Sequence, residues 1–418
     1  MNDAIAGNWP ERYAGFVGAL STSGREATTL RLGVFLCGMS SVVDARVDMH
    51  DMEALASSPA HSRAGALFSL LKDRADRGVG GEVKFDWPDG PKWIRTNVKV
   101  RHALGGTGPQ AAWVLSKLGA SALIALEDRH SLMLQQIPRG VLVAQDGKLI
   151  EADEVTPSPQ TVPETFIFEY TAGKTVADVA CRRSSRIIVR FIDRGLQNDV
   201  EFDSMSTGLA SSAAAGLLSG LNDVSFDQLP EASEKVFTLA RSWRDAGLKV
   251  IHFELAGYSS SGALNLVLGA LRGSVTSIGM SQSELLTLHP DAQQPMEAMI
   301  ALGERLNLNR VCVHADNWAA AVTKCDPNQE LRALMAGCAI ASARAATGAP
   351  VERVTIAADA KFEPLPFQGY ARKGEWSFVA CSAPYLEKPA TTLGLGDSFT
   401  AGCLLVLGRR SITPGVEV

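Results

Sequence analysis

Short apolar runs alternate with longer amphipathic stretches through the second half of the chain. The runs that predict strands lie at 250–255, 274–280, 310–313 and 354–356, and the stretches that predict helices lie at 231–246, 295–306 and 330–347. Strands that are apolar along their whole length are typical of parallel sheets covered by helices on both faces. The pattern therefore predicts an α/β fold, built on a large, doubly wound, mostly parallel sheet flanked by helices.

The first half begins with the same pattern. An apolar run at 32–37 ends at Gly38 and predicts a buried strand. A charged helix is predicted at 62–77, followed by the breakers Gly78, Gly80 and Gly81. Gly105 and Gly106 precede an Ala-rich helix at 110–118 and a strand at 122–125.

Two segments depart from this pattern, with Trp, Pro, Asp-Gly and alternating polar and apolar positions. Short antiparallel strands with one solvated face are predicted within 82–99, at 165–170 and at 187–192. We therefore expect residues 46–104 and 149–196 to form a small β-rich domain inserted into the large one. Residues 1–45, 105–148 and 197–418 are expected to form the large α/β domain.

Composition narrows the possible partners and compartment. The 418 residues carry a net charge of −5, which gives no basic excess for binding nucleic acid. The seven cysteines include no CxxC pair and are odd in number, as expected for reduced thiols in the cytoplasm. No apolar run approaches the length of a membrane span, and the first residues lack the pattern of a signal peptide. The sequence leaves a monomer and a homodimer equally open.

The strongest local motif is Gly394-Leu395-Gly396-Asp397, ahead of a helix predicted at 398–407. This arrangement places the backbone N–H groups of Leu395, Gly396 and Asp397 at a helix N-terminus, where they hold anions. A carboxylate in the same turn can take the proton from a hydroxyl that attacks a bound phosphoryl group. The alternative is a glycine-rich turn in which Asp397 is only a helix cap.

Two glutamates follow predicted strands of the large sheet. Glu254 lies at the end of strand 250–255, two residues after His252, and Glu284 lies just after strand 274–280. Ligands of open α/β sheets collect beyond the carboxyl ends of the strands, and two carboxylates near one phosphate require a cation, for which Mg²⁺ is the usual choice. The alternatives are solvated loop charges and a hydrogen-bonded core histidine.

Asp44 lies just past the first predicted strand. With Gly105 and Gly106, where a backbone can approach a ligand closely, it is placed to bind sugar hydroxyls. The alternative is a turn-forming aspartate beside a glycine loop.

In this order, these motifs resemble the ADP-dependent glucokinase/phosphofructokinase family, a branch of the ribokinase-like sugar kinases. The segment 252–256, His-Phe-Glu-Leu-Ala, resembles its HxE motif, and 277–285 resembles its NxxE stretch. Further similarity lies in Gly105-Gly106, in 166–170 and in 311–314, and 394–397 matches its GxGD motif. The similarity spans most of the chain, from about Gly33 to Leu407.

The resemblance implies a sugar kinase that transfers a phosphoryl group from ADP, leaving AMP, to a hydroxyl of a hexose, hexose phosphate or related sugar. Asp397 is then the catalytic base, and the backbone amides of Leu395, Gly396 and Asp397, in the motif that Gly394 opens, supply the anion hole. Glu254 and Glu284 hold the Mg²⁺ shell. The small domain is expected to be a lid over the site.

The resemblance also suggests the residues that bind the two substrates. Those implied for the sugar are Asp44, Gly105, Gly106, Thr107 and Glu82. The residues implied to bind the nucleotide are Arg190 and His252. The expected small-molecule partners are therefore a sugar and a nucleotide.

Three positions depart from the family's motifs. Ser281 replaces the asparagine of NxxE, the segment before Asp44 lacks its asparagine, and Thr107 replaces the glutamine after the glycine pair. Because two of the three touch the sugar pocket, a different sugar is expected. An ATP-dependent kinase of the same fold and a non-catalytic sugar- or nucleotide-binding regulator remain as alternatives.

Overall fold

The computed structural model describes residues 8–26, 33–290 and 295–409. Its larger sheet has eleven strands in the order β17-β18-β16-β15-β14-β13-β12-β1-β5-β6-β7. The run from β15 to β6 is parallel: β1 (Phe35–Gly38), β5 (Ala122–Ile124), β6 (Val141–Gln145), β12 (Ala215–Leu218), β13 (Ile251–Glu254), β14 (Ser277–Ser281) and β15 (Arg310–His314). Antiparallel strands extend it at both edges: β7 (Lys148–Glu151), β16 (Trp318–Thr323), β17 (Tyr370–Lys373) and β18 (Trp376–Ser382).

Helices cover both faces of this sheet, which confirms the predicted fold class. Alternate side chains of one strand enter opposite cores, as the period of two requires: Phe35 and Cys37 pack on one side and Leu36 on the other. The first side holds α2 (Trp9–Glu26), α6 (Thr107–Lys117), α7 (Ser131–Leu134), α13 (Pro327–Thr347) and α14 (Leu395–Leu407). The second holds α8 (Val200–Leu209), α9 (Leu229–Asp245), α10 (Ser261–Leu271), α11 (Gln282–Leu288) and α12 (Pro295–Leu306). We call this assembly the large lobe.

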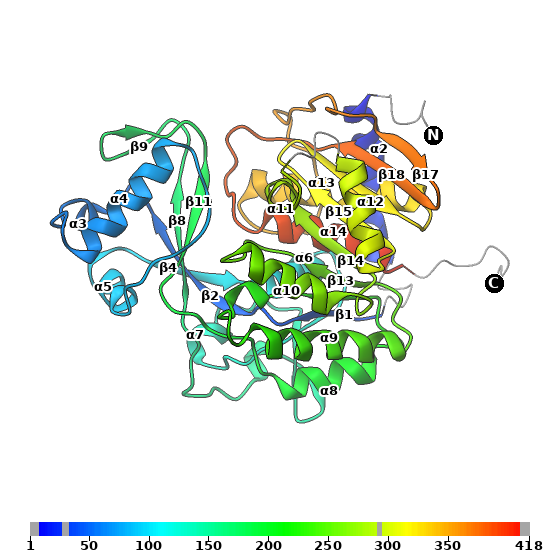
Figure 1. Ribbon diagram of the computed structural model, residues 1–418, viewed down its shortest axis with the longest axis horizontal. Helices are drawn as coiled ribbons and strands as arrows, with labels where there is room; N and C mark the ends of the chain where they lie inside the picture. The colour runs from blue at the N-terminus through cyan, green and yellow to red at the C-terminus, as the bar shows by residue number, and fades with distance from the viewer. Residues whose placement is uncertain (1–7, 27–32, 291–294, 410–418) are drawn as a thin grey trace.

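A second sheet of five strands has its own apolar core and lies to the left in Figure 1. Its order is β3 (Gly81–Lys84), β11 (Ser185–Arg190), β8 (Thr165–Tyr170), β2 (Val42–Asp48) and β4 (Arg101–Gly105). It packs with α3 (Glu53–Ala56), α4 (Arg63–Asp76) and α5 (Gly90–Asn97), and carries the hairpin β9 (Thr175–Val176) and β10 (Val179–Ala180). We call this assembly the small lobe.

Two predictions of local structure were wrong. Segment 82–99 does not form antiparallel strands: β3 pairs in parallel with β11, and residues 90–97 form α5, which has Pro91 in its first turn. Proline fits that position because the first-turn N–H groups of a helix have no acceptor within it. Residues 354–356 are not a strand, and the edge of the sheet is formed instead by β16, β18 and β17. The first residue of the strand predicted at 32–37 lies outside the described residues.

The lobes meet where the chain passes from β1 to β2. The side-chain amide of Gln197 accepts a hydrogen bond from Ser41 N and donates one to Ser41 O, both 3.1 Å long. Gly106 and Gly220 lie against the backbone of residues 39 and 40, where a Cβ would meet carbonyl oxygens at 1.7 and 2.1 Å. The junction is therefore closely packed. Within the described ranges, no helix combines the length and apolarity of a membrane span.

Candidate active site

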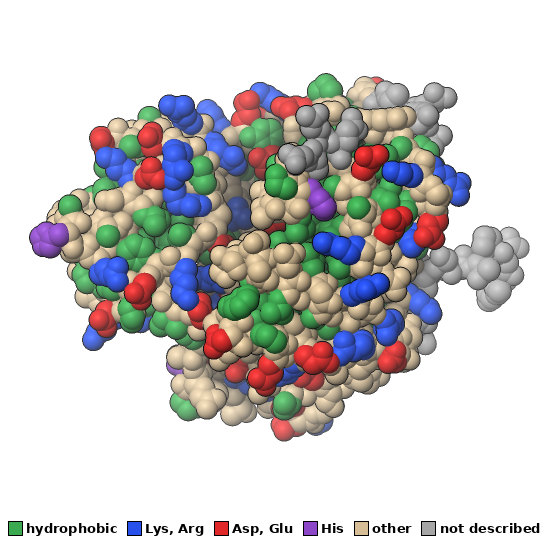
Figure 2. Space-filling model, viewed as in Figure 1, with side chains coloured by type: hydrophobic (Ala, Val, Ile, Leu, Met, Phe, Trp, Pro, Cys, Tyr) green, Lys and Arg blue, Asp and Glu red, His purple; other side chains and the backbone are tan. Residues whose placement is uncertain are grey.

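A cleft lies between the two lobes, and Figure 2 shows it as a hollow with charged side chains inside. The small lobe contributes residues of β2, β3, β8 and β11. The large lobe contributes the start of α6, the loop after β12 and the turn before α14. The lining includes Ser40, Asp44, Glu82, Thr107, Gln110, Arg186, Arg190, Asn222, Asp223, Gly394 and Asp397.

The turn before α14 has the geometry of an anion site. Gly394 is the N-cap, with φ of 71°, a left-handed conformation that favours glycine. The first backbone hydrogen bond of the helix runs from Ser398 N to Gly394 O, at 3.0 Å. The N–H groups of residues 395–397 therefore precede the hydrogen-bonded part of the helix and have no acceptor within it.

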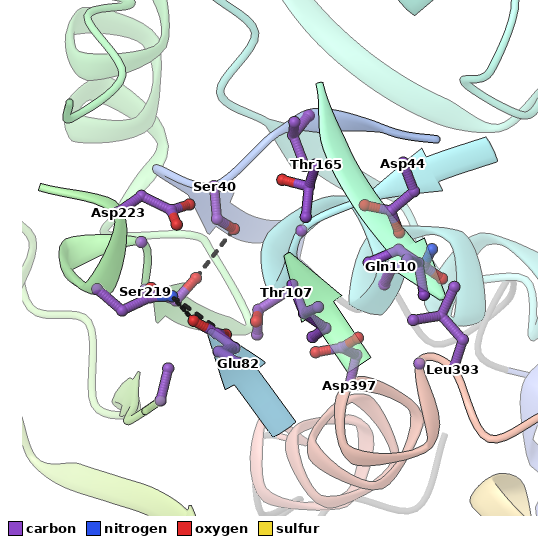
Figure 3. A pocket seen from close by; sticks show the side chains of 18 of the residues that line it. Ser40, Asp44, Glu82, Thr107, Gln110, Thr165, Ser219, Asp223, Leu393 and Asp397 are labelled. Carbon is purple, nitrogen blue, oxygen red and sulfur yellow. Dashed lines mark hydrogen bonds between the residues drawn. The ribbon is translucent and has the colours of Figure 1, made fainter. Parts of the chain in front are cut away.

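Asp397 lies in the first turn of α14 and lines the cleft, as do Thr107, Gln110 and Asp44 (Figure 3). Burial raises the pKa of Asp397, while the charge of Arg344 and a hydrogen bond from Thr107 oppose the rise. A carboxylate whose pKa is moved toward neutrality is suited to accept a proton from an alcohol.

Asp44 enters the cleft from β2 and is 5% exposed. Burial raises its pKa to about 8, although the charge of Arg194 acts in the opposite direction. Gly105 leaves room for this side chain: a Cβ there would lie 2.2 Å from Asp44 Oδ1. Gly105 does not line the cleft itself, whereas Gly106 does.

Glu82 and Arg190 face each other across neighbouring strands β3 and β11. Arg190 Nη2 lies 3.2 Å from Glu82 Oε2, and Arg190 Nη1 lies 3.0 Å from Asp223 Oδ1. Asn222 Nδ2 donates to Glu82 Oε2 at 3.2 Å, and Arg194 pairs with Asp223. Carboxylates thus neutralise two of the three arginines that line the cleft.

Arg186 is the third arginine and differs from the other two. It lines the cleft from β11, and its side chain makes no hydrogen bond or ion pair with another described residue. Its charge acts on Asp397, whose pKa it lowers. Arg186 was missed by the sequence analysis because an arginine in an alternating strand gives no sign of which face it occupies.

Glu254 lies at the end of β13, is 8% exposed and does not line the cleft. Its Oε2 lies 2.9 Å from His252 Nε2 and accepts from Thr400 Oγ1 at 3.2 Å, and its Oε1 lies 3.5 Å from His314 Nε2. Burial alone would raise the pKa of Glu254, but the hydrogen bonds from the two histidines lower it to about 2. Glu254 is therefore a buried carboxylate that stays charged.

His252 is buried at 2% exposure behind Glu254 and does not line the cleft. Its Nδ1 lies 2.8 Å from Ser277 Oγ, and Arg310 Nη1 donates to the same oxygen at 3.2 Å. Because the Ser277 oxygen accepts from Arg310, its own hydrogen is free for His252 Nδ1, which leaves Nε2–H to donate to Glu254. Burial lowers the pKa of His252, in agreement with a neutral ring.

Glu284 has a local structural partner. It occupies the third position of α11 and forms a capping box with Ser281: Ser281 N donates to Glu284 Oε2 at 2.7 Å, and Glu284 N donates to Ser281 Oγ at 3.3 Å. Burial raises its pKa to about 7, and the nearby charge of Glu254 adds to the rise. Among the described residues no group of three or more His, Cys, Asp or Glu side chains could hold a metal directly. Two mutually repelling carboxylates instead fit a cation that keeps its own water ligands.

The structure thus brings most of the sequence-predicted residues to one cleft. Those in its lining are Asp44, Glu82, Gly106, Thr107, Arg190, Gly394 and Asp397. Gly105, Leu395 and Gly396 lie directly beside lining residues in the chain, while His252, Glu254 and Glu284 lie outside the lining. Glu254 is nevertheless close to the turn, since His314, its partner, lies 3.3 Å from where a Cβ of Gly396 would be.

A half-buried acid next to free helix N-terminal amides, in a cleft between two lobes, suits the transfer of a phosphoryl group to an alcohol. Residues 74–406 match the sequence profile of the ADP-specific phosphofructokinase/glucokinase conserved region. The chain therefore belongs to this family, as its motifs suggested, and is an ADP-dependent sugar kinase. No curated protein sequence gives a significant match.

Solved structures support the same fold. The chain is similar to an ADP-dependent kinase in complex with fructose-6-phosphate and ADPβS, at 17% identity and a TM-score of 0.76, covering 97% of this chain and 99% of that one. It is also similar to the last common ancestor of ADP-dependent phosphofructokinases from Methanosarcinales (16%, TM-score 0.70, 96% and 98%). A third similar structure is a hypothetical ADP-dependent phosphofructokinase from Pyrococcus horikoshii OT3 (16%, TM-score 0.71, 90% and 97%).

Proposed function

We propose that this kinase phosphorylates an unphosphorylated sugar in the cleft between the lobes, with ADP as donor, AMP as the second product and Mg²⁺ as the required cation. The observation that carries this proposal is the position of Asp397, half-buried in the first turn of α14 and facing the same cleft as Asp44.

The reaction needs one proton transfer and one bond exchange. Asp397 accepts the proton of the sugar hydroxyl, the hydroxyl oxygen bonds to the β-phosphorus of ADP, and the bond from that phosphorus to the AMP oxygen breaks. The backbone N–H groups of residues 395–397 stabilise the charge on the transferring group. Arg186, which lacks a carboxylate partner among the described residues, is assigned to the same phosphates.

Asp44 and Glu82 are assigned to the sugar. Both side chains line the cleft, and Asp44 is buried, so an analogue that lacks the matching hydroxyl would leave a buried acceptor unpaired. Thr107 and Gly106 shape the same wall, as proposed from the sequence, and Gly105 leaves room for the Asp44 side chain. The small lobe closes over the bound sugar as a lid and excludes water.

The charge balance of the pocket argues for an acceptor that carries no phosphate. Arg190 and Arg194 are already neutralised by Glu82 and Asp223. A phosphate on the sugar would have to displace these carboxylates or lie beside them. A neutral polyhydroxylated ring instead finds both acceptors and donors at this wall.

The proposed Mg²⁺ shell uses Glu254 and Glu284. When bound, the ion neutralises charge on the phosphates of the nucleotide. Glu254 stays ionised and is oriented by His252, so we assign His252 to positioning this carboxylate. Contact of His252 with the nucleotide is disfavoured because the ring lies outside the lining.

The test is a panel of free and phosphorylated sugars, offered with ADP or ATP and Mg²⁺, in which AMP release and sugar phosphate formation are both measured. We expect turnover with ADP and a free sugar, and a loss of at least about 10³-fold in kcat for Asp397→Asn with both substrates still bound. Preserved kcat in that variant contradicts the role of Asp397. Preference for ATP, or binding without turnover, would favour the alternative kinase or the regulator.

A further inference from the structure

Arg344 is a buried cation without an acidic partner. It lies in the last turn of α13 and is 3% exposed. Its Nη2 donates to Gln110 Oε1 at 2.6 Å and its Nη1 donates to Ser398 Oγ at 3.1 Å, while its Nε has no partner in the described part of the chain. Among the described residues, no carboxylate lies within ion-pair distance of this guanidinium. All of its hydrogen-bond acceptors are neutral.

The guanidinium lies directly against the Gly394 turn. A Cβ at Gly394 would be 2.3 Å from Arg344 Nη2 and 2.4 Å from Cζ. Ser398, which accepts from Arg344, itself donates to Gly394 O at 2.7 Å. Arg344 thus contacts the backbone that carries the free N–H groups of the anion site, although it does not itself line the cleft.

This position is unfavourable for a cation in the free protein. A helix N-terminus carries partial positive charge, so a positive side chain beside the start of α14 is repelled, although the C-terminal end of α13 attracts it. Burial adds a desolvation cost that an ion pair would ordinarily offset. Burial also lowers the pKa of Arg344 to about 10, which still leaves the group charged at neutral pH.

The other charged groups near Arg344 offset this positive charge only in part. The acids that act on it are Asp397 and Asp44, whose own pKa values are raised, and the cations are Arg46 and Arg186. An anion that docks at the Gly394 turn would meet the combined charge of the helix terminus and Arg344. An anion at this turn would therefore offset a positive charge that the free protein holds.

We propose that Arg344 is a positioning and electrostatic residue, which acts through the Gly394 turn to stabilise the negative charge that develops on the transferring phosphoryl group. This inference rests on the proposed phosphotransfer at the same turn. It differs from a purely structural role, in which the forked side chain only ties α13 to α6 and α14.

The test compares two variants. Arg344→Gln removes the charge and keeps a hydrogen-bonding group, whereas Arg344→Lys keeps the charge and loses the planar guanidinium that donates to two partners at once. Ser398→Ala is the matched control, because it removes one hydrogen-bond partner and leaves the charge. We expect Arg344→Gln to lower kcat by about 10²- to 10³-fold with the sugar KM changed less than about threefold. Arg344→Lys and Ser398→Ala should each stay within about tenfold of the wild type.

A binding measurement separates charge stabilisation from structure. Aluminium fluoride with AMP and the sugar mimics the transferring group, and its affinity is compared with that of AMP and the sugar alone. Arg344→Gln should lose affinity for the mimic in proportion to its loss in kcat and keep its affinity for AMP. Equal losses of kcat in the Gln and Lys variants, or unchanged affinity for the mimic, overturn the proposal. If Arg344→Gln does not fold, a loss above about tenfold in Arg344→Lys overturns it.

Failure of the proposed function gives a different result. If the wild type turns over no sugar with any donor, inorganic phosphate serves as the probe, and thermal stabilisation is followed. Phosphate that stabilises the wild type but not Arg344→Gln supports the charged role of Arg344 at an anion site. Equal stabilisation of both proteins overturns it.

Discussion

The Thr107 side chain lowers the pKa of the Asp397 carboxyl and so links the first turns of two helices, α6 and α14, that are nearly 300 residues apart in the chain. Figure 3 shows the two side chains together at the wall of the cleft. The residue that replaces the family's glutamine therefore contacts the proposed catalytic base. This contact links the departure at position 107 to the chemistry as well as to the sugar pocket.

The pH dependence of turnover should report Asp397. Because burial raises its pKa and the base acts only when deprotonated, kcat/KM should fall as the pH drops through a value above the usual aspartate range. Thr107→Val removes a donor that stabilises the charged form, so the acid limb should move to higher pH. Thr107→Ser, which keeps the hydroxyl, is the control. An identical acid limb in Thr107→Val would contradict this assignment.

Stability should fall as the pH rises through the range in which Asp44 titrates. In the folded protein its pKa is raised to about 8, whereas the unfolded chain titrates near the ordinary value of about 4. The folded state therefore binds the extra proton, and the free energy of unfolding declines between these two values, by ~1.4 kcal/mol per pH unit at most.

Asp44→Asn removes this titration. Urea unfolding at pH 6 and pH 9 should show a flatter pH dependence in the variant, and the variant should be more stable than the wild type at pH 9 by a few kcal/mol, roughly. Parallel pH profiles for the two proteins would show that burial of Asp44 does not shift its titration.

Gly105→Ala should weaken sugar binding indirectly, by moving the Asp44 carboxylate. The new Cβ would lie 2.2 Å from Asp44 Oδ1 and 2.8 Å from Val42 Cγ1, so the Asp44 carboxylate must move. We expect the sugar KM to rise by about tenfold or more, equivalent to about 1.4 kcal/mol, with a smaller change in nucleotide KM. Gly208→Ala, where a Cβ meets nothing within 4 Å, is the control. An unchanged sugar KM in Gly105→Ala would remove Asp44 from the sugar site.

Glu254→Gln should raise the Mg²⁺ concentration required for half-maximal turnover. The substitution removes a carboxylate that stays ionised because His252 and His314 donate to it, and with it the charge that attracts the cation. We expect a shift of about tenfold or more in the Mg²⁺ titration. His252→Gln should shift the titration less, since the carboxylate remains. A titration that superimposes on that of the wild type would exclude Glu254 from the shell.

The sequence was sufficient for the parallel core of the fold and for the Asp397 turn. Fully apolar strands and a Gly-x-Gly-Asp before a helix carry strong local signals. The antiparallel edge was missed because β16 is Trp-Ala-Ala-Ala-Val-Thr, whose alanines favour helix when taken alone, and only pairing with β15 and β18 makes it a strand. The helix α5 was missed because its sequence carries Gly, Pro and Trp, which also suit short strands.

The site was predicted less completely than the fold. Arg344 lies in an Ala-rich helix, where an arginine usually faces solvent, and only the packing of α13 against α14 buries it. The ion pairs of Arg190 with Glu82 and Asp223 join segments that are far apart in the chain, so no local sequence pattern predicts them. Residues that act through such long-range contacts emerge only from the folded structure.

The two hydrogen bonds between Gln197 and Ser41 also hold the chain in place at the junction of the lobes. Asp44 follows Ser41 by three residues. Glu82 lies on β3, which is three strands away from β2 and hence roughly 14 Å from it across the sheet. If the small lobe rotates about Ser41, Glu82 and Arg190 move farther than Asp44, and their bonds to Asn222 and Asp223 of the large lobe have to break. The end of a bound sugar near Asp44 would then stay almost in place, while the end near Glu82 would undergo most of the movement.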